Sequence, residues 1–389
     1  MPDPIVRLPA EAAQFIAGGG RDVDSAKLAI EAAPGAQLRL EDDRGDELGL
    51  AIFDPDNDRL RVMATPADGF PSIGGALLGW RVERAMRLRR DLGLVETDAT
   101  YRVLHGAGDG VPGFTCDVLG AVGVLYAYSP ALLPLARLLA DAVRGFAKLT
   151  GVCIKIRARG GADQVPQEIV GDVPDTLVAR EHGVPFEIHP RGGLNTGLFT
   201  DMREHRRGLA RFAADRRVLN LFSYTGALSV ACARAGARTV TSVDTSPGVA
   251  AWAQANFSLS ELRDPKRYRF ETGDAVRFLA RAAKDREQYD LILIDPPTFS
   301  TARGAPWTLD KDYPDLIAQA SSQLAPGGLL WLAANTHELG SLVRLAARGF
   351  KKSGRTAAVL ETGGLPPDYP TLPAQLRDRY LQVALFRVA

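Results

Sequence analysis

Cysteine is scarce in this chain of 389 residues, which carries only Cys116, Cys153 and Cys232. The three are scattered and odd in number, a pattern that argues against a disulfide framework or a zinc site and fits a reducing cytoplasm. No segment approaches the run of about 20 apolar residues that spans a bilayer. No basic and then apolar stretch follows Met1, so no secretory signal is predicted. We therefore expect a cytoplasmic protein with no membrane contact and no metal.

The net charge is also small, at +1, but it is unevenly distributed. Residues 1–68 carry 14 acidic and 7 basic side chains, a net charge of −7, so residues 69–389 must sum to +8. A polyanion would therefore meet the later part of the chain first. The length of the chain predicts two or three domains.

The second half of the chain alternates regularly between strand-like and helix-like segments from about residue 217 onward. Such alternation predicts a parallel, doubly wound α/β sheet. The last strand follows its predecessor without a helix between them, so we expect it to run antiparallel. The expected strands are 218–222, 239–243, 267–271, 291–294, 329–333, 355–361 and 380–388, and the expected helices are 226–235, 247–257, 274–284, 312–324 and 338–348.

Two smaller modules are expected before this sheet. Residues 36–64 alternate polar and apolar side chains between turn signals, which predicts a small antiparallel β unit. Residues 76–92 predict a helix rich in arginine, whose charged side chains we expect on a solvated face rather than on RNA. The second module continues with strand-like runs near 101–104, 113–118 and 121–128, a helix near 132–148 and a strand at 151–157.

The segment Asp290–Ser300 combines an apolar strand with an abrupt end. Its composition predicts a strand covered on both faces, and Pro296 and Pro297 stop it because proline cannot donate to a β ladder. Asp295 would then lie at the carboxyl edge of a parallel sheet, where open α/β sheets bind their ligands. A tight turn that merely closes a core strand is the alternative for this segment taken alone.

Residues at three other strand ends suit an adenosine. Gly226 opens a helix after the segment Asn220–Gly226, which lacks the glycine pattern of dinucleotide-binding loops. Asp244 ends the second strand, where its carboxylate could accept from ribose hydroxyls or cap a helix. Asp274 follows the third strand and could bond an adenine amino group, cap the next helix, or do both. A site for an adenosine without phosphates suggests S-adenosylmethionine as the cofactor.

From about residue 95 to the end, the chain resembles the class I S-adenosylmethionine-dependent methyltransferases of large-subunit ribosomal RNA. The resemblance implies a small PUA-like β domain over 1–68, an α+β central domain over 69–190 that contacts RNA, and a Rossmann-like seven-stranded methyltransferase domain over 191–389. The segments that carry the resemblance are Tyr101–Gly113, Asn195–Arg203, Val218–Gly226, Asp295–Phe299 and Tyr380–Val388.

The same resemblance implies roles for matched positions. Residues 195–203 would cover the cofactor, and Arg203 would pair with its carboxylate. Asn220, Phe222, Thr225 and Gly226 would line its methionine end. The implied cofactor-binding residues are Thr196, Phe199, Arg203, Asn220, Phe222, Thr225, Gly226, Asp244, Thr245, Asp274, Ala275 and Asp295.

The position of the cysteines bears on the reaction. The larger part of this family makes 5-methylcytosine, which requires a cysteine thiolate that attacks the base. Neither the fifth-strand end Trp331–His337 nor the Asp295–Phe299 turn contains a cysteine, and all three cysteines are expected to be small buried hydrophobes. We therefore predict methylation at a base nitrogen, which already has a lone pair and needs only in-line placement.

The catalytic residues predicted for this reaction are Asp295, Pro296 and Phe299. The Asp295 carboxylate or the Pro296 carbonyl would accept from a base amino group, and Phe299 would stack on a base swung out of its helix. Trp307 and Tyr313 could form an aromatic lid over the base or anchor the loop.

Four alternatives stay open at this point. One is a cytosine carbon-5 methyltransferase, a second is a nucleotide-dependent oxidoreductase on a similar sheet, and a third is a small-molecule methyltransferase. The fourth is a non-catalytic RNA-binding ribosome-assembly factor, which the acidic first segment and the unusual Asn195 and Met202 keep open. Large-subunit ribosomal RNA is the expected partner, and a homodimer is left open.

Overall fold

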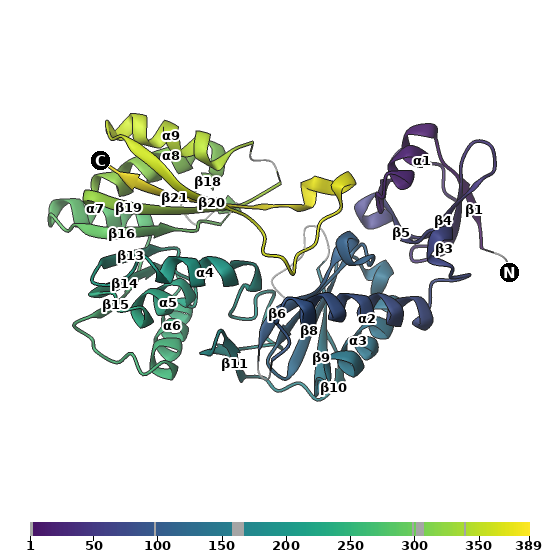
Figure 1. Ribbon diagram of the computed structural model, residues 1–389, viewed down its shortest axis with the longest axis horizontal. Helices are drawn as coiled ribbons and strands as arrows, with labels where there is room; N and C mark the ends of the chain where they lie inside the picture. Colours follow the sequence, from purple (N-terminus) through teal and green to yellow (C-terminus); the bar gives the residue numbers. More distant parts are fainter. Residues whose placement is uncertain (1–2, 97–98, 158–166, 298, 301–306, 338–339) are drawn as a thin grey trace. The chain divides into compact units, whose positions relative to one another are not determined.

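The chain forms two compact units in the computed structural model (Figure 1). The model describes residues 3–96, 99–157, 167–297, 299–300, 307–337 and 340–389. Unit 1 comprises Met1–Gly183, Ile188–Thr196 and Pro367–Leu376, and unit 2 comprises Val184–Glu187, Gly197–Pro366 and Arg377–Ala389. No helix among the described residues is long and apolar enough to cross a membrane. The three-domain division at residues 68 and 190 stays a prediction.

Unit 1 begins with a five-stranded sheet in the order β1-β3-β4-β5-β2. The antiparallel pairing of β3, β4 and β5 matches the β unit predicted over 36–64. The alternating side chains of β4 enter two different cores, since Leu50 and Ile52 pack in one and Ala51 packs in the other. Residues 1–35, for which no element was predicted, contribute a parallel edge strand, a helix and a second edge strand. The elements are β1 (Ile5–Arg7), α1 (Ala10–Ala17), β2 (Asp22–Asp24), β3 (Gln37–Glu41), β4 (Glu47–Asp54) and β5 (Arg59–Ala64).

A second five-stranded sheet, in the order β10-β9-β8-β7-β6, completes unit 1 together with two helices. Apolar side chains of the helices, of this sheet and of β4 and β5 share one core. The elements are α2 (Gly75–Asp91), β6 (Thr100–His105), β7 (Phe114–Leu119), β8 (Val122–Ala127), α3 (Leu133–Ala147), β9 (Gly151–Ile156) and β10 (Gln167–Gly171). The strands β11 (Leu177–Glu181) and β12 (Val184–Ile188) lie where the chain passes into unit 2.

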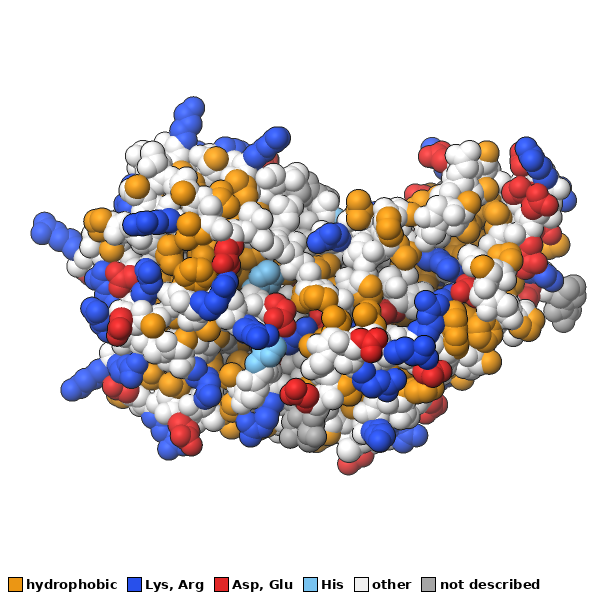
Figure 2. Space-filling view, in the orientation of Figure 1, with side chains coloured by type: hydrophobic (Ala, Val, Ile, Leu, Met, Phe, Trp, Pro, Cys, Tyr) orange, Lys and Arg blue, Asp and Glu red, His pale blue; other side chains and the backbone are white. Residues whose placement is uncertain are grey.

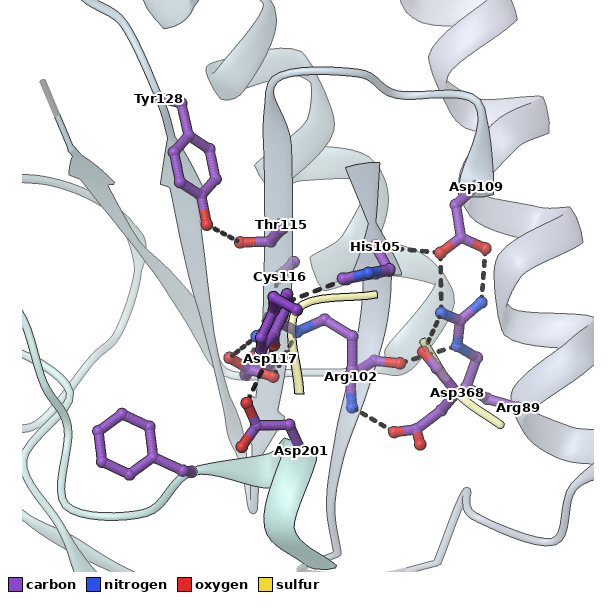
Figure 3. Close-up of polar contacts among 12 residues, drawn as sticks. Arg89, Arg102, His105, Asp109, Thr115, Cys116, Asp117, Tyr128, Asp201 and Asp368 are labelled. Carbon is purple, nitrogen blue, oxygen red and sulfur yellow. Dashed lines mark hydrogen bonds and ion pairs between the residues drawn. The ribbon is translucent and has the colours of Figure 1, made fainter. Parts of the chain in front are cut away.

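The arginines of α2 do not all lie on a solvated face, so that prediction is wrong for two of them. Arg81 and Arg89 are buried, and Arg84, Arg87 and Arg90 are exposed. Figure 3 shows the Arg89 guanidinium facing the carboxylate of Asp109. A buried guanidinium is tolerated where carboxylates and carbonyls satisfy its N–H groups, a condition that sequence periodicity does not reveal.

Unit 2 is built on a seven-stranded sheet in the order β15-β14-β13-β16-β19-β21-β20. The first five strands are parallel, whereas β21 enters antiparallel between β19 and β20, as predicted. The strands are β13 (Arg217–Leu221), β14 (Thr239–Asp244), β15 (Tyr268–Thr272), β16 (Tyr289–Ile294), β19 (Leu324–Asn335), β20 (Ala357–Gly363) and β21 (Leu381–Val388). A short antiparallel ladder of β17 (Phe299–Ser300) and β18 (Trp307–Thr308) follows β16 in the chain.

Helices cover both faces of the large sheet (Figure 1). One face packs on α7 (Ala275–Lys284), α8 (Leu309–Ser322) and α9 (Leu342–Ser353), and their apolar side chains share a hydrophobic core with the strands. The other face carries α4 (Arg203–Ala210), α5 (Ala227–Arg234) and α6 (Pro247–Leu259). This arrangement confirms the predicted Rossmann-like α/β fold class and leaves the carboxyl edge of the parallel strands for a ligand.

Candidate active site

A cavity of about 340 Å³ lies along the carboxyl edge of the large sheet in unit 2. It extends from Asp244 at the end of β14, past the ends of β13 and β16, to Asn335 at the end of β19 and Leu381 at the start of β21. Its volume is within the range of about 300–1,000 Å³ typical of small-molecule sites. The lining residues are Gly197, Leu198, Phe199, Asp201, Met202, Arg206, Phe222, Ser223, Tyr224, Ala227, Leu228, Asp244, Thr245, Asp295, Pro296, Pro297, Asn335 and Leu381.

The loop after β13 forms one wall of this cavity and has an unusual backbone. Phe222 has φ +60° and Tyr224 has φ +47°, a left-handed region that bulky residues rarely adopt. The loop is held by hydrogen bonds from Ser223 N–H to the Val243 carbonyl, at 3.0 Å, and from Tyr224 N–H to Asp244 Oδ2, at 2.9 Å. Strained backbone of this kind persists where its surroundings fix it, and it concentrates at ligand sites.

Asp244 lies at the β14 end of the cavity. Its carboxylate is predicted from the sequence to bind the ribose of the cofactor. Its Oδ2 accepts from Tyr224 N–H and its Oδ1 from Ser246 N–H, at 3.2 Å. Each carboxylate oxygen has further acceptor capacity, so both oxygens can also accept from hydroxyl groups of a ligand. Thr245 lines the cavity beside it. The side chain of Ser246, not that of Asp244, caps the N-terminus of α6. The alternative prediction, that Asp244 is a helix cap, is therefore wrong.

Three residues predicted to line the methionine end of the cofactor contact other residues of the protein and do not line the cavity. Asn220 is fully buried and donates to Ser229 Oγ at 2.9 Å, whereas its Oδ1 has no partner among the described residues. Thr225 donates to the Gly197 carbonyl at 2.6 Å. At Gly226, whose φ is +75°, a Cβ atom would lie 3.0 Å from Ala253 on α6. These residues shape the loop, and their contact with the cofactor stays a prediction.

The segment 195–203, predicted to cover the cofactor and here called the lid segment, also lines the cavity. Phe199 lines the cavity, and its ring lies 5.2 Å from that of Tyr224. Arg203 is buried, with Nε 3.1 Å from Glu204 Oε1, and it does not line the cavity. Thr196 belongs to unit 1, where its carbonyl accepts from His189 N–H at 2.9 Å. The cofactor contacts of Arg203 and Thr196 stay predictions.

Asp274 and Ala275 lie at the start of α7, outside the lining of the cavity. Asp274 Oδ1 accepts from the N–H groups of Val276 and Arg277, both at 3.0 Å, so this carboxylate caps the helix. Ala275 is buried in the main core of unit 2. The cap and a contact to adenine are compatible, because a carboxylate has further acceptor sites.

Asp295 follows β16 at the middle of the cavity, and Pro296 lies next to it. Desolvation and the neighbouring carboxylate of Asp201 raise the pKa of Asp295 to about 7, and the guanidinium of Arg206 opposes that rise. Perturbed carboxyl groups inside a cavity are typical of functional sites. The side chain of Phe299 lies outside the described part of the chain, so its predicted stacking role stays a prediction.

Tyr313 is an anchor rather than a lid. Its ring is fully buried, and its hydroxyl lies 3.0 Å from the carbonyl of Ile294 and 2.9 Å from the carbonyl of Ala333. It therefore fixes the ends of β16 and β19, and with them the backbone that leads to Asp295. The side chain of Trp307 lies outside the described part of the chain.

Several lining residues were not predicted from the sequence, above all Asp201, Arg206 and Tyr224. Asp201 is buried and accepts from the hydroxyl of Tyr380 at 2.9 Å. Asp201 lies within residues 195–203 and Arg206 just beyond them, so position alone could have suggested both. Tyr224 could have been recognised because it replaces a glycine of the dinucleotide-binding pattern.

The cavity contains no thiol. All three cysteines are buried, and none of them lines it. Burial raises the pKa of Cys232, on α5, to about 12, so this thiol stays protonated. No cluster of potential metal ligands occurs among the residues that the structure describes.

Comparison with known proteins identifies the family. Residues 131–381 match the model of a family described as S-adenosylmethionine-dependent methyltransferase. The chain belongs to this family. Among the relatives of this methyltransferase, the Ribosomal RNA large subunit methyltransferase of Deinococcus radiodurans is 31% identical over 87% of this chain and 86% of the relative. Ribosomal RNA large subunit methyltransferase I of Cronobacter sakazakii is 28% identical over 92% of this chain and 91% of the relative.

A solved structure from Streptococcus mutans, described as a SAM-dependent methyltransferase, has the same fold as this methyltransferase. It superposes with a TM-score of 0.86, at 24% identity, over 99% of this chain and 100% of the other. The family match over residues 131–381 shows that S-adenosylmethionine is the cofactor of this methyltransferase, as predicted, and this cofactor supplies a methyl group on a positively charged sulfur. The cavity fits it, because it joins a carboxylate suited to ribose hydroxyls with the apolar side chains of Phe199, Phe222 and Leu228.

Proposed function

We propose that this methyltransferase transfers a methyl group to a base nitrogen of large-subunit ribosomal RNA, in the cytoplasm. The RNA substrate is supported by the names of its full-length relatives, which specify ribosomal RNA of the large subunit. The choice of nitrogen is supported by one observation: the cavity along the sheet edge holds carboxyl groups and no thiol.

The missing thiol matters because carbon-5 of cytosine is not nucleophilic enough by itself. A cysteine thiolate must first add to the ring, and a buried Cys232 whose pKa is raised to about 12 cannot supply one. A ring or amino nitrogen needs no such activation, because its own lone pair can attack a methyl group held in line. The protein then has to orient the base and accept from its N–H groups.

The positions of residues along the cavity support the roles that we propose for them. Asp244 and Thr245 lie at the β14 end, where they would hold the ribose of the cofactor, and Phe222 lies between that end and Asp295. Asp295 and the carbonyl of Pro296 would accept from the base that is methylated. A base enters such a pocket only after it has left its stack, a step that costs a few kcal/mol in duplex RNA.

A surface on α2 is suited to the RNA backbone. Arg84, Arg87 and Arg90 are exposed at a spacing of three residues, which places them along one stripe of the helix. The guanidinium carbon of Arg84 lies 4.7 Å from the ring centroid of Trp80. Figure 2 shows basic side chains over the face of unit 1 that carries α2. We propose that these arginines contact phosphates. The sequence alone favoured a solvated face over an RNA contact for this helix, although the resemblance implied an RNA contact for the central domain.

The test of the function is methyl transfer by the purified protein. We would incubate it with isotope-labelled S-adenosylmethionine and unmethylated large-subunit ribosomal RNA, digest the RNA to nucleosides and identify the product by mass spectrometry. The expected product is a nucleoside methylated at a base nitrogen, and Asp295→Ala should make far less of it. Labelled 5-methylcytosine would contradict the nitrogen proposal. Cofactor binding without any transfer would favour a non-catalytic RNA-binding protein.

The α2 surface has its own test. Replacing Arg84 and Arg87 by alanine should weaken RNA binding and reduce its dependence on salt, since each phosphate contact contributes about one unit to the salt slope. Arg348→Ala on α9, where the guanidinium pairs with Asp310 at 2.8 Å, is the matched control. Equal RNA affinity and salt slope in both variants would exclude the α2 surface.

A further inference from the structure

A second, smaller cavity lies in unit 2, on the face of the large sheet that carries α4. Its volume is about 170 Å³, and it shares no lining residue with the larger cavity at the carboxyl edge of the sheet. We call it the α4 pocket. Its lining includes Trp331 of β19, Val383 and Leu385 of β21, and His205, Gly208 and Leu209 of α4.

Trp331 brings a hydrogen-bond donor to this pocket. The residue is only 3% exposed, and the centroid of its ring lies 6.4 Å from that of His205. Its indole N–H has no hydrogen-bond partner among the residues that the structure describes. Buried indole N–H groups usually find a partner, so this donor is available to an acceptor atom of a ligand.

His205 brings an acceptor. Its Nε2 lies 2.8 Å from the carbonyl oxygen of Gly364, and because a carbonyl can only accept, Nε2 carries the proton. Desolvation lowers the pKa of His205, so the ring is neutral at pH 7 and Nδ1 keeps a free lone pair. Nδ1 lies beside Gly363, which also lines the pocket. The pocket therefore presents one donor and one acceptor on two neighbouring aromatic rings.

The rest of the lining favours a neutral ligand. The guanidinium of Arg211 donates to Glu361 at 2.8 Å, and the Glu204 carboxylate lies 3.1 Å from Arg203 Nε, so these charges are already paired. Leu209 and the two β21 side chains supply apolar surface. A cavity of about 150 Å³ is large enough for benzene, so the α4 pocket has room for one small ring system whose substituents extend outside.

A nucleobase has this size and this chemistry. Its ring is neutral and apolar on both faces, and its edge carries an acceptor beside an N–H donor. Adenine offers the pair in two ways, because its amino group lies between the ring acceptors N1 and N7. We propose that the α4 pocket binds a single unpaired base, preferably adenine, whose ring nitrogen accepts from Trp331 and whose amino group donates to His205.

The position of the pocket indicates where such a base comes from. Leu381 of β21 lines the larger cavity, and Val383, two residues farther along the same strand, lines the α4 pocket. Residues two apart on a strand point to the same face and lie about 7 Å from each other. A nucleotide close to the methylated one can therefore occupy the α4 pocket, a step that rests on the proposed function. A free nucleoside is the other source of the same chemistry.

The indole N–H signal of Trp331 in an NMR spectrum reports binding directly. We would saturate isotope-labelled protein with S-adenosylhomocysteine, to fill the larger cavity, and then add adenosine. One of the four tryptophan signals should move, and Trp331→Phe identifies it. We expect a Kd on the order of 1 mM, as suits a ligand with few buried atoms. Purine riboside, which lacks the amino group, should bind about 3–10-fold more weakly because the hydrogen bond to His205 is lost.

Gly208→Leu tests the pocket without removing a polar group. Gly208 lies inside α4 with open space at its Cβ position, so a leucine there should fill part of the pocket and abolish the shift of the Trp331 signal. Gly145→Leu is the matched control, because Gly145 lies inside α3 and also has open space around it. No movement of the Trp331 signal with any of the four nucleosides, or equal movement in Gly208→Leu, would overturn the base site. Tighter binding of another nucleoside would overturn the preference for adenine.

Methyl transfer distinguishes the two sources of the base. If the base belongs to the RNA, Gly208→Leu should raise the KM for ribosomal RNA by about 3–10-fold, with kcat unchanged and the affinity for S-adenosylhomocysteine within about twofold of wild type. An unchanged KM in a variant that no longer binds adenosine would overturn the RNA source and assign the pocket to a free nucleoside. If wild type transfers no methyl group to ribosomal RNA at all, the proposed function fails, whereas the Trp331 signal still decides the base site.

Discussion

The guanidinium of Arg89 and the carboxylate of Asp109 meet through two parallel contacts, Nη1 to Oδ1 at 2.6 Å and Nη2 to Oδ2 at 2.8 Å (Figure 3). The Arg89 side chain has no exposed surface, and its other N–H groups donate to the carbonyls of Arg102 and Asp368. Asp368 belongs to Pro367–Leu376, the part of unit 1 that comes from late in the sequence. Arg89 therefore joins α2, the η3 turn at Gly106–Asp109 and this late segment within one unit.

We expect Arg89→Leu to destabilise unit 1 by about 3–5 kcal/mol, because it leaves the buried Asp109 carboxylate without its counter-charge. Arg90→Leu, which changes an exposed neighbour on the same helix, should cost no more than about 0.5 kcal/mol. Urea unfolding of both variants measures the difference. Similar midpoints for the two would show that the buried pair does not contribute as its geometry indicates.

Asp244→Ala should weaken cofactor binding without abolishing folding. The variant removes an acceptor for ribose hydroxyls and the hydrogen bond that holds Tyr224 N–H, so we expect the Kd for S-adenosylhomocysteine to rise by about 10–100-fold. Isothermal titration calorimetry measures this change, and Asp285→Ala, at the exposed end of α7, is the control. An unchanged Kd would remove Asp244 from the cofactor site.

Stability should depend on pH through Asp295. Because its pKa is raised from 3.8 to about 7, the folded protein retains a proton that the unfolded chain has already lost. The resulting stabilisation is complete below the unfolded pKa and is lost as the pH rises through about 7. We therefore expect the free energy of unfolding of wild type to fall more between about pH 5 and pH 8 than that of Asp295→Asn. Parallel pH profiles would be inconsistent with the raised pKa.

Gly226→Ala should destabilise unit 2. The φ of +75° disfavours any side chain, and the added Cβ would lie 3.0 Å from Ala253, so we expect a loss of about 1–3 kcal/mol. Gly208→Ala is the matched control, because Gly208 lies inside α4 with open space around it and should gain about 0.5–1 kcal/mol. Thermal unfolding of the two variants should shift in opposite directions. A shift in the same direction would mean that Gly226 is not conformationally required.

Local pattern predicted much of unit 2 correctly. The seven strands of the large sheet and the helices between them, the antiparallel entry of β21 and the sheet edge at Asp295 follow from which residues are apolar and where proline and glycine interrupt them. The short strands β17 and β18 were not predicted. Asp244, which lines the cavity, was found in the same way, because the carboxyl ends of parallel strands meet at one edge. Phe222, which also lines it, was implied by the family resemblance.

Side-chain direction and long-range contacts were not accessible to the same reasoning. Asn220 was predicted to contact the cofactor, yet its amide donates to Ser229 because the strand β13 alternates its side chains between two faces. The burial of Arg89 depends on Asp109 and on Asp368, which lies 279 residues away in the sequence. Such partners become neighbours only when distant segments pack together.

The amino-acid sequence by itself thus determined the α/β architecture and the edge of the sheet that carries the cavity, because both depend on periodicity and on residues close together in the chain. Its motifs indicated the methyltransferase family by resemblance. Only the tertiary structure decided which charged groups share the cavity. Tyr380 meets Asp201 across 179 residues of sequence, and the proximity of the Asp201 charge to Asp295 raises a pKa that neither residue type would reveal alone. Electrostatic coupling depends on distance and burial, and folding sets both.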